Sequence, residues 1–131
     1  MAVQALSKGI QMSPRKIGVV ASLVRGRTVA DALVILDHTP RRAAIPVIKA
    51  IKSAQANAEH NHNYQPKTLR IVSLEVGSGP SLKRFKPISH GRAHPFLKRT
   101  THLKVVVDGT QREVKKAAVQ SSAAKKAEEK K

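Results

Sequence analysis

The chain has 131 residues, which suits one domain with a single modest core, and its formal net charge is +17. The absence of cysteine excludes disulfides, thiolate zinc sites and cysteine nucleophiles, and because Tyr64, Phe85 and Phe96 are the only aromatic residues, we expect an aliphatic core. The sequence has no signal peptide and nothing near the ~18 apolar residues of a membrane span, so we expect a soluble, cytosolic protein that inserts in no membrane.

The N-terminal segment predicts a strand followed by a helix. Residues 2–11 alternate weakly between apolar and polar side chains and predict a short strand. Ser13-Pro14 predicts a helix start, because the serine oxygen can cap free amides and proline at the first helical position loses no hydrogen bond. Gly26 is expected to end this helix. Its apolar stripe is formed by Ile17, Val20, Ala21 and Val24.

A second, short helix is predicted to begin at Thr28. Thr28 can cap its first turn, and the carboxylate of Asp31, three residues later, favours the unpaired amides there. We expect Leu33 and Leu36 to face the core, with Ile35 as a possible addition.

The third helix is predicted to be the longest, opening at Thr39-Pro40. Pro46 either kinks this helix or marks its true first turn, and the sequence leaves both readings open. Apolar residues recur along it at spacings of three and four, namely Ala44, Val47, Ile48, Ile51, Ala54 and Ala58.

Two apolar, β-branched segments follow, and a long basic segment joins them. Together they predict a β-hairpin, about residues 77–104, that projects beyond the core with arms of at most ~40 Å. No acidic residue lies between Glu75 and Asp108. Turn-forming residues occupy the middle, at Pro87, Ser89, Gly91 and Pro95. The cations are Lys83, Arg84, Lys86, Arg92, Lys98, Arg99 and Lys104.

The order of elements predicts an α+β fold, with three helices packed on a small three-stranded antiparallel sheet and a long protruding β-hairpin. Residues 1–110 form the predicted domain. Residues 111–131 are rich in Ala, Lys and Glu, and we expect a basic tail that is disordered alone and at most helical when bound.

The net charge predicts a polyanionic partner, and nucleic acid is favoured over an acidic membrane surface. A solvated surface loop is the plain alternative for the basic segment. The sequence lacks helix-turn-helix and zinc-finger spacing, and it has too few aromatic residues for a platform that stacks several bases. We therefore expect an RNA-binding domain that recognises folded RNA through its shape and phosphates. Phe85 either contacts the partner or packs at the base of the hairpin.

The remaining polar motifs predict neither a metal site nor an enzyme. His60 and His62 lie near Glu59, but two histidines separated by one residue do not share a helix face, and no third ligand is evident. Serine, histidine and aspartate occur in no catalytic context. We expect His90, His94 and His102 to contact RNA or solvent, and we predict no cofactor.

The chain resembles a known family over about residues 5–108, the bacterial form of the large-subunit ribosomal protein L-twenty-two family. The matching motifs occur in order along the chain and are Ser13-Pro14-Arg15-Lys16, Arg25-Gly26-Arg27, Lys52-Ser53-Ala54, Ala56-Asn57-Ala58-Glu59-His60-Asn61, Gly79-Pro80, Leu82-Lys83-Arg84-Phe85, Gly91-Arg92-Ala93, and Lys98-Arg99-Thr100 with His102. After Lys86-Pro87 this sequence has Ile88-Ser89-His90, where the family usually shows a basic residue and an alanine.

The resemblance implies a structural, non-enzymatic constituent of the large ribosomal subunit that binds rRNA and supports assembly. Its partners would be large-subunit rRNA, neighbouring large-subunit ribosomal proteins and, at the hairpin tip, the nascent polypeptide. Implied RNA-binding residues are Arg15, Lys16, Arg25, Arg27, Lys83, Arg84, Lys86, Arg92, Lys98, Arg99 and His102. The tip implied to line the peptide exit tunnel consists of Ile88, Ser89, His90, Gly91, Arg92 and Ala93.

Overall fold

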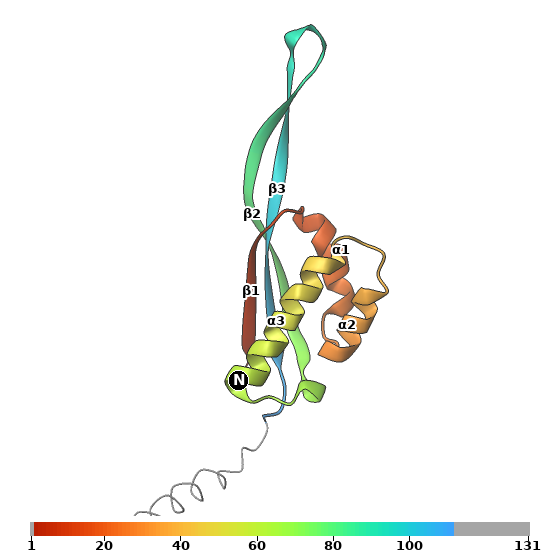
Figure 1. Cartoon of the computed structure of the whole chain (residues 1–131), viewed down its shortest axis with the longest axis vertical. Helices are drawn as coiled ribbons and strands as arrows, with labels where there is room; N and C mark the ends of the chain where they lie inside the picture. The colour runs from red at the N-terminus through yellow and green to blue at the C-terminus, as the bar shows by residue number, and fades with distance from the viewer. Residues whose placement is uncertain (1, 112–131) are drawn as a thin grey trace, which may run out of the picture.

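A computed structural model describes residues 2–111 of the chain, so the predicted tail lies outside the described residues except for Gln111. A body of helices and sheet stands at one end of a long two-stranded arm (Figure 1). The helices are α1 (Pro14–Val24), α2 (Val29–Asp37) and α3 (Ala44–His62), with short 3₁₀ helices η1 (Pro66–Thr68) and η2 (Ser89–Gly91). The strands are β1 (Val3–Ile10), β2 (Arg70–Pro87) and β3 (Ala93–Asp108).

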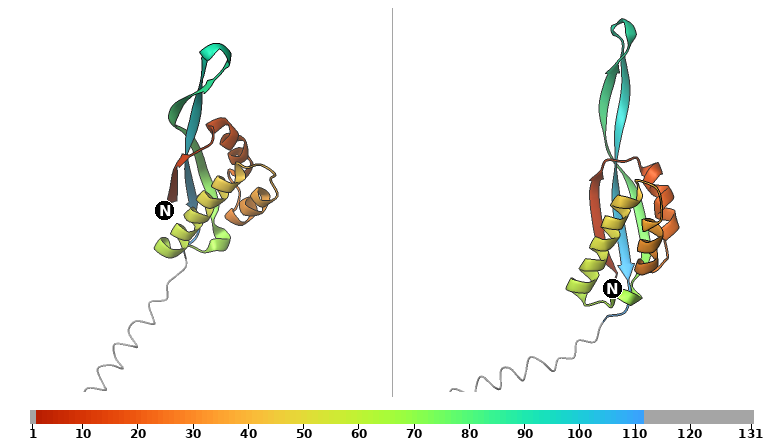
Figure 2. Two further views of the ribbon diagram at one scale, coloured as in Figure 1. Left: turned by 45° about the horizontal axis from the view of Figure 1, so that its top comes forward. Right: turned by 45° about the vertical axis from the view of Figure 1, so that its right-hand side comes forward.

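The three strands form one antiparallel sheet in the order β1-β3-β2. All three helices cover the same face of this sheet, as the two turned views show (Figure 2). Beyond the body, β2 and β3 continue alone as the arm. This architecture confirms the predicted α+β fold with a protruding hairpin.

The core lies between the helices and the covered face of the sheet. Alternate residues of β3, which are Leu103, Val105 and Val107, are fully buried there, as the period of a strand requires. The predicted stripe of α1 is also fully buried. Tyr64, only 1% exposed, is the exception to the expectation of an aliphatic core.

The first two helices begin where the sequence predicts. Ser13 is the residue before α1, but its side chain makes no capping hydrogen bond, so that part of the prediction is wrong. Thr28 does cap α2, because its Oγ1 accepts from the amide of Asp31 at 3.2 Å. Leu36 is buried and Leu33 packs partly buried against the core, as predicted.

The third helix begins at Ala44 rather than at Thr39-Pro40, so the predicted start is wrong. The preceding residues form a turn instead, in which the amide of Arg41 donates to the carbonyl of Thr39 at 2.7 Å. Pro46 lies in the first turn of α3, where a missing N–H breaks no hydrogen bond. The alternative of a kink at Pro46 is therefore excluded.

The arm is defined here as residues 80–99, and in this segment every residue except the half-buried Phe96 is exposed. At the tip the amide of Ile88 donates to the carbonyl of Arg92 at 2.8 Å, and His90 and Gly91 adopt positive φ. Pro95 lies inside β3 opposite Phe85, so its predicted place in the turn is wrong. A two-stranded arm tolerates proline because the outward edge of each strand needs no donor.

Candidate nucleic-acid interface

The arm leaves the body at a set of contacts between β1, the start of α1 and β3. The buried hydroxyl of Thr101 donates to the carbonyl of Met12, and the amide of Gly9 donates to Nδ1 of His102 at 3.1 Å. Both strands that flank β3 shift register close to this point. The direction of the arm relative to the body is therefore set by specific hydrogen bonds.

An open hollow of about 1030 Å³ lies where the arm meets the body. Four segments line it, which are the end of β1 with the turn that follows, the first turn of α1, the turn before α3, and the lower arm. We define the basic elbow as the six cationic residues that line this hollow, which are Lys16, Arg41, Arg42, Arg84, Lys98 and Arg99. Of the described residues that line the hollow, none is a carboxylate.

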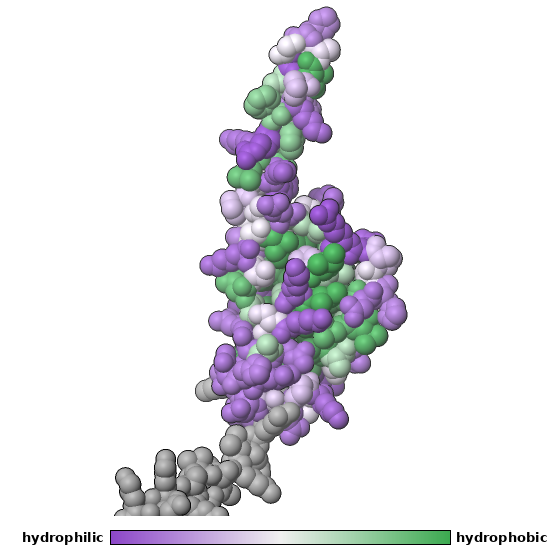
Figure 3. Space-filling view, in the orientation of Figure 1, coloured by the Kyte–Doolittle hydropathy of each residue, from purple (hydrophilic) through white to green (hydrophobic). Residues whose placement is uncertain are grey.

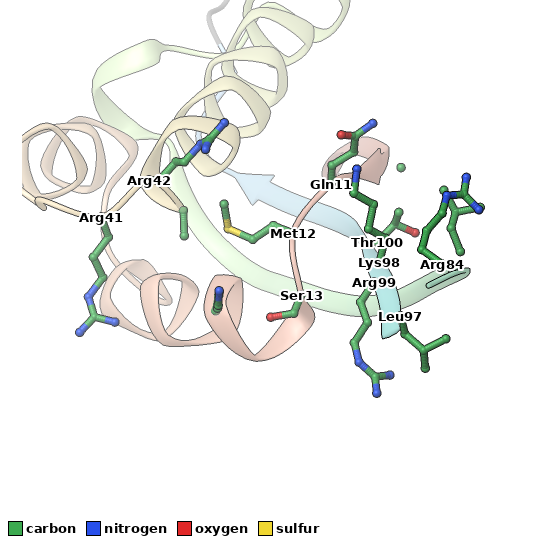
Figure 4. A pocket seen from close by; sticks show the side chains of 14 residues that line it. Gln11, Met12, Ser13, Arg41, Arg42, Arg84, Leu97, Lys98, Arg99 and Thr100 are labelled. Carbon is green, nitrogen blue, oxygen red and sulfur yellow. The ribbon is translucent and has the colours of Figure 1, made fainter. Parts of the chain in front are cut away.

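Figure 4 shows how the elbow is divided between the two parts of the molecule. Arg41 and Arg42 extend from the turn before α3, whereas Arg84, Lys98 and Arg99 extend from the arm. Met12 and Ser13 lie between the two groups. Like charges held on both sides of an open hollow create a positive potential that a polyanion entering the hollow would neutralise.

The strand register sorts the arm residues onto two faces. Arg84 pairs with Phe96 and Lys86 with His94, so these residues share a face with Lys98, and we call this the basic face. On it the ammonium of Lys86 lies 5.6 Å from the centroid of the Phe96 ring. The opposite face has an apolar strip, defined by Phe85, Pro87, Ala93, Pro95 and Leu97.

The structure brings some of the predicted residues together and separates others. Four of the predicted residues line the hollow as members of the elbow, namely Lys16, Arg84, Lys98 and Arg99. Arg25 and Arg27 lie elsewhere on the body, where their Nε atoms donate to the carbonyls of Leu74 and Leu23, both at 3.0 Å. Other predicted positions outside the elbow are Arg15 on α1, Lys83 and Lys86 along the arm, and half-buried His102 at its base.

The six residues predicted to form the tip surround the turn between β2 and β3. They are Ile88, Ser89, His90, Gly91, Arg92 and Ala93, and all are exposed. Phe85 is 70% exposed close to this turn. Its alternative placement, packed at the base of the arm, is therefore wrong.

Arg41 and Arg42 line the hollow but are not among the residues predicted from the sequence. The available signal was an Arg-Arg pair directly after Thr39-Pro40, but the predicted helix would have spread these side chains around its first turn. Because α3 begins later, both residues lie on a turn that faces the arm.

The described part of the chain contains neither a group of metal ligands nor a membrane-spanning helix. Among residues 2–111 no group of three His, Asp or Glu side chains could hold a metal ion. Within the same range no helix is long and apolar enough to span a bilayer.

Comparison with known proteins adds a family assignment. The family model for "Ribosomal protein L22p/L17e" matches residues 5–108. The "Large ribosomal subunit protein uL22" of Clostridium novyi is 49% identical over 107 residues, which cover 82% of this chain and 96% of the relative. The proteins of the same name from Clostridioides difficile and Herpetosiphon aurantiacus are 48% and 44% identical, with the same coverage of both chains.

Matches of this length and identity extend over the helices, the sheet and the whole arm. They also agree with the resemblance noted in the sequence motifs. The chain therefore belongs to the ribosomal protein L22p/L17e family.

Proposed function

We propose that this chain is a structural constituent of the large subunit of the cytoplasmic ribosome and binds large-subunit rRNA through the basic elbow and the arm. One observation supports this most directly, which is that six cations from separate segments face one open hollow that no described carboxylate lines. The family is a structural component of the ribosome, in agreement with the prediction that the chain is not an enzyme.

The chemistry of the elbow suits phosphate. Arginine presents a planar fork of donors that matches two phosphate oxygens, and lysine adds point charge. Binding of several phosphates releases condensed counterions, so the affinity should fall steeply as salt rises. The segment between Glu75 and Asp108 contains no acidic residue. A phosphate backbone that runs from the elbow along the arm would therefore meet no carboxylate of this segment.

The proposed RNA-binding set joins the predicted residues with the two that the structure adds. Its members are Arg15, Lys16, Arg25, Arg27, Lys83, Arg84, Lys86, Arg92, Lys98, Arg99 and His102, together with Arg41 and Arg42. Since β1, α1, the turn before α3 and the arm all contribute, the bound RNA would have to fit a concave corner. Such shape recognition is typical of folded rRNA and would support subunit assembly.

The tip is proposed to line the peptide exit tunnel and to contact the nascent polypeptide. Support comes from the shape of the molecule, because the tip residues 88–93 lie at the far end of the arm, away from the body (Figure 1). The body, at the other end, remains free to contact neighbouring large-subunit ribosomal proteins.

Salt-dependent binding to an in vitro transcript of large-subunit rRNA tests the proposal. In the arm variant, Lys83, Arg84, Lys98 and Arg99 are replaced by alanine. The control variant replaces four body cations that do not line the hollow, which are Lys49, Lys52, Lys67 and Arg70. We expect the arm variant to bind much more weakly than the control. Its log K should also depend less steeply on log salt, by about 0.9 for each phosphate that is no longer bound.

Two results would contradict the proposal. If the arm variant and the control variant lose the same affinity for the transcript, binding depends on the net charge of the protein and not on the position of the cations. Sedimentation of the full chain outside the large-subunit fraction at moderate salt would instead indicate a free regulatory or DNA-binding protein.

A further inference from the structure

The apolar strip on the arm has no role in phosphate binding. Phe85 is 70% exposed and Leu97 is 46% exposed, and the register places Phe85 opposite Pro95 and Pro87 opposite Ala93. Figure 3 shows hydrophobic residues along the arm, interspersed with hydrophilic ones. The described body does not cover this strip, because residues 81–95 are all exposed.

The charges around the strip restrict what can bind there. Lys83 lies on the same face, opposite Leu97, and Arg99 follows towards the base of the arm. An apolar peptide on the strip would remove these cations from water without pairing them, which is unfavourable. A nucleotide combines a flat apolar surface with a negative charge a few ångströms away, so it matches both features of the strip.

The other phenyl and phenol rings are less available than the ring of Phe85. Tyr64 is only 1% exposed in the core. Phe96 is half-buried on the basic face, with the Lys86 ammonium 5.6 Å from its ring centroid. Phe85 therefore offers the open ring face that base stacking requires.

We propose that Phe85, supported by Pro95 across the hairpin, is a stacking site for a single unpaired RNA base, with Lys83 binding the phosphate of the same strand. This inference rests on the proposed function and adds selectivity to it. The basic face binds any phosphate backbone, whereas a stacked base has to be unpaired and turned out of its helix. The arm would thereby distinguish a loop or bulge from continuous duplex.

Binding measurements with the same rRNA transcript separate stacking from charge. Replacement of Phe85 by alanine should weaken binding by about 5- to 100-fold and leave the salt dependence unchanged, because no ion is released by a stacked ring. Lys83→Ala should instead lower the salt slope by about one unit. Val72→Ala, at a body residue that is 60% exposed, serves as the matched apolar control and should have no effect.

Phe85→Leu tests whether the ring itself matters. Leucine keeps an apolar side chain but has no π-face, so we expect Phe85→Leu to bind nearly as weakly as Phe85→Ala. If Phe85→Leu binds the transcript with the same affinity as the unmodified protein, the stacking proposal is overturned and the contact at position 85 is a simple apolar one.

Because the chain has no tryptophan, Phe85→Trp introduces a single fluorophore at the site. Stacking on a base should quench its emission when the transcript binds. Phe96→Trp, on the opposite face one strand away, is the control and should be quenched less. Equal quenching at the two positions would overturn the proposed preference for one face.

The occupant of the strip is identified in assembled large subunits with a photo-crosslinking benzophenone amino acid at position 85. A crosslink to rRNA supports the proposal, and one to a ribosomal protein or nascent chain overturns it. If the full chain does not bind the transcript at all, the proposed function and this inference both fail. If binding and its salt dependence are normal but Phe85→Ala binds like the unmodified protein, only the stacking site is refuted.

Discussion

Gly79 and Thr100 approach each other so closely across the hairpin that a Cβ atom on Gly79 would lie 2.5 Å from Thr100 Oγ1. The same Cβ would lie 3.2 Å from the carbonyl carbon of Thr100 and 3.2 Å from Cε1 of His102. Thr100 cannot easily turn away, because its hydroxyl donates to the carbonyl of Pro80 at 2.6 Å. The irregular pairing at the base of the arm therefore requires glycine.

Gly79→Ala should destabilise the protein by about 1–3 kcal/mol, the usual cost of forcing an extra methyl group into a tightly packed place. Urea denaturation of the full chain measures this destabilisation. Gly18→Ala is the control, because a Cβ at this position in α1 meets nothing within 4 Å and alanine favours a helix by about 0.5–1 kcal/mol. The requirement for glycine would be wrong if Gly79→Ala were as stable as the unmodified protein.

Thr101→Val should lower the free energy of unfolding by about 1–3 kcal/mol, although valine has nearly the same shape. The reason is that the carbonyl of Met12 would no longer have the buried hydroxyl that donates to it. Thr101→Ser keeps the hydroxyl that donates to Met12, so we expect it to be destabilised less than Thr101→Val. Thermal denaturation of the three proteins gives the comparison, and a valine variant more stable than the serine variant would contradict it.

Shortening the arm should leave the body folded. Replacement of residues 84–96 by Asn-Gly would close the hairpin with a two-residue turn between the paired residues Lys83 and Leu97. We expect a cooperative thermal transition, because the removed residues contribute little to the core. Leu74→Ala, at a core position of β2 in the body, should cost about 2–5 kcal/mol by contrast. A molten shortened protein would show that the arm contributes to the core.

The double replacement of Arg41 and Arg42 by alanine should weaken binding to the rRNA transcript and reduce the salt slope by up to about 1.8, or 0.9 for each bound phosphate. Both residues are exposed, so the folded structure should be retained. The control is the double replacement of Lys49 and Lys67 by alanine, which removes the same amount of charge from body positions that do not line the hollow. Identical binding by the two double variants would remove Arg41 and Arg42 from the interface.

Features encoded by neighbouring residues could be predicted from the sequence. The α1 stripe follows from helical spacing, and the start of α2 follows from Thr28 and Asp31, whose side chains also contact each other at 2.7 Å. The protruding hairpin follows from two apolar, β-branched segments that are joined by a long basic segment with turn-forming residues. Each of these depends only on residues close together in the chain.

Features that depend on distant residues could not be predicted. The hollow is lined by residues as far apart in the chain as Gly9, Arg41 and Arg99, which no local pattern indicates. Which face of the arm carries Phe85 depends on the strand register, and a slip of one residue would move it to the other face. That register follows an irregularity between Ser78 and Ser81, where Gly79 lies.

The central position of β3 has a mechanical consequence. One continuous strand forms half of the arm and then passes between β1 and β2 in the middle of the sheet. A pull on the tip along the strand axis would thus load the hydrogen-bond ladders on both sides of β3 in shear, many bonds at once, rather than peel an edge strand away one bond at a time. Because the arm continues into the middle of the sheet, tension on its tip is resisted by the whole sheet.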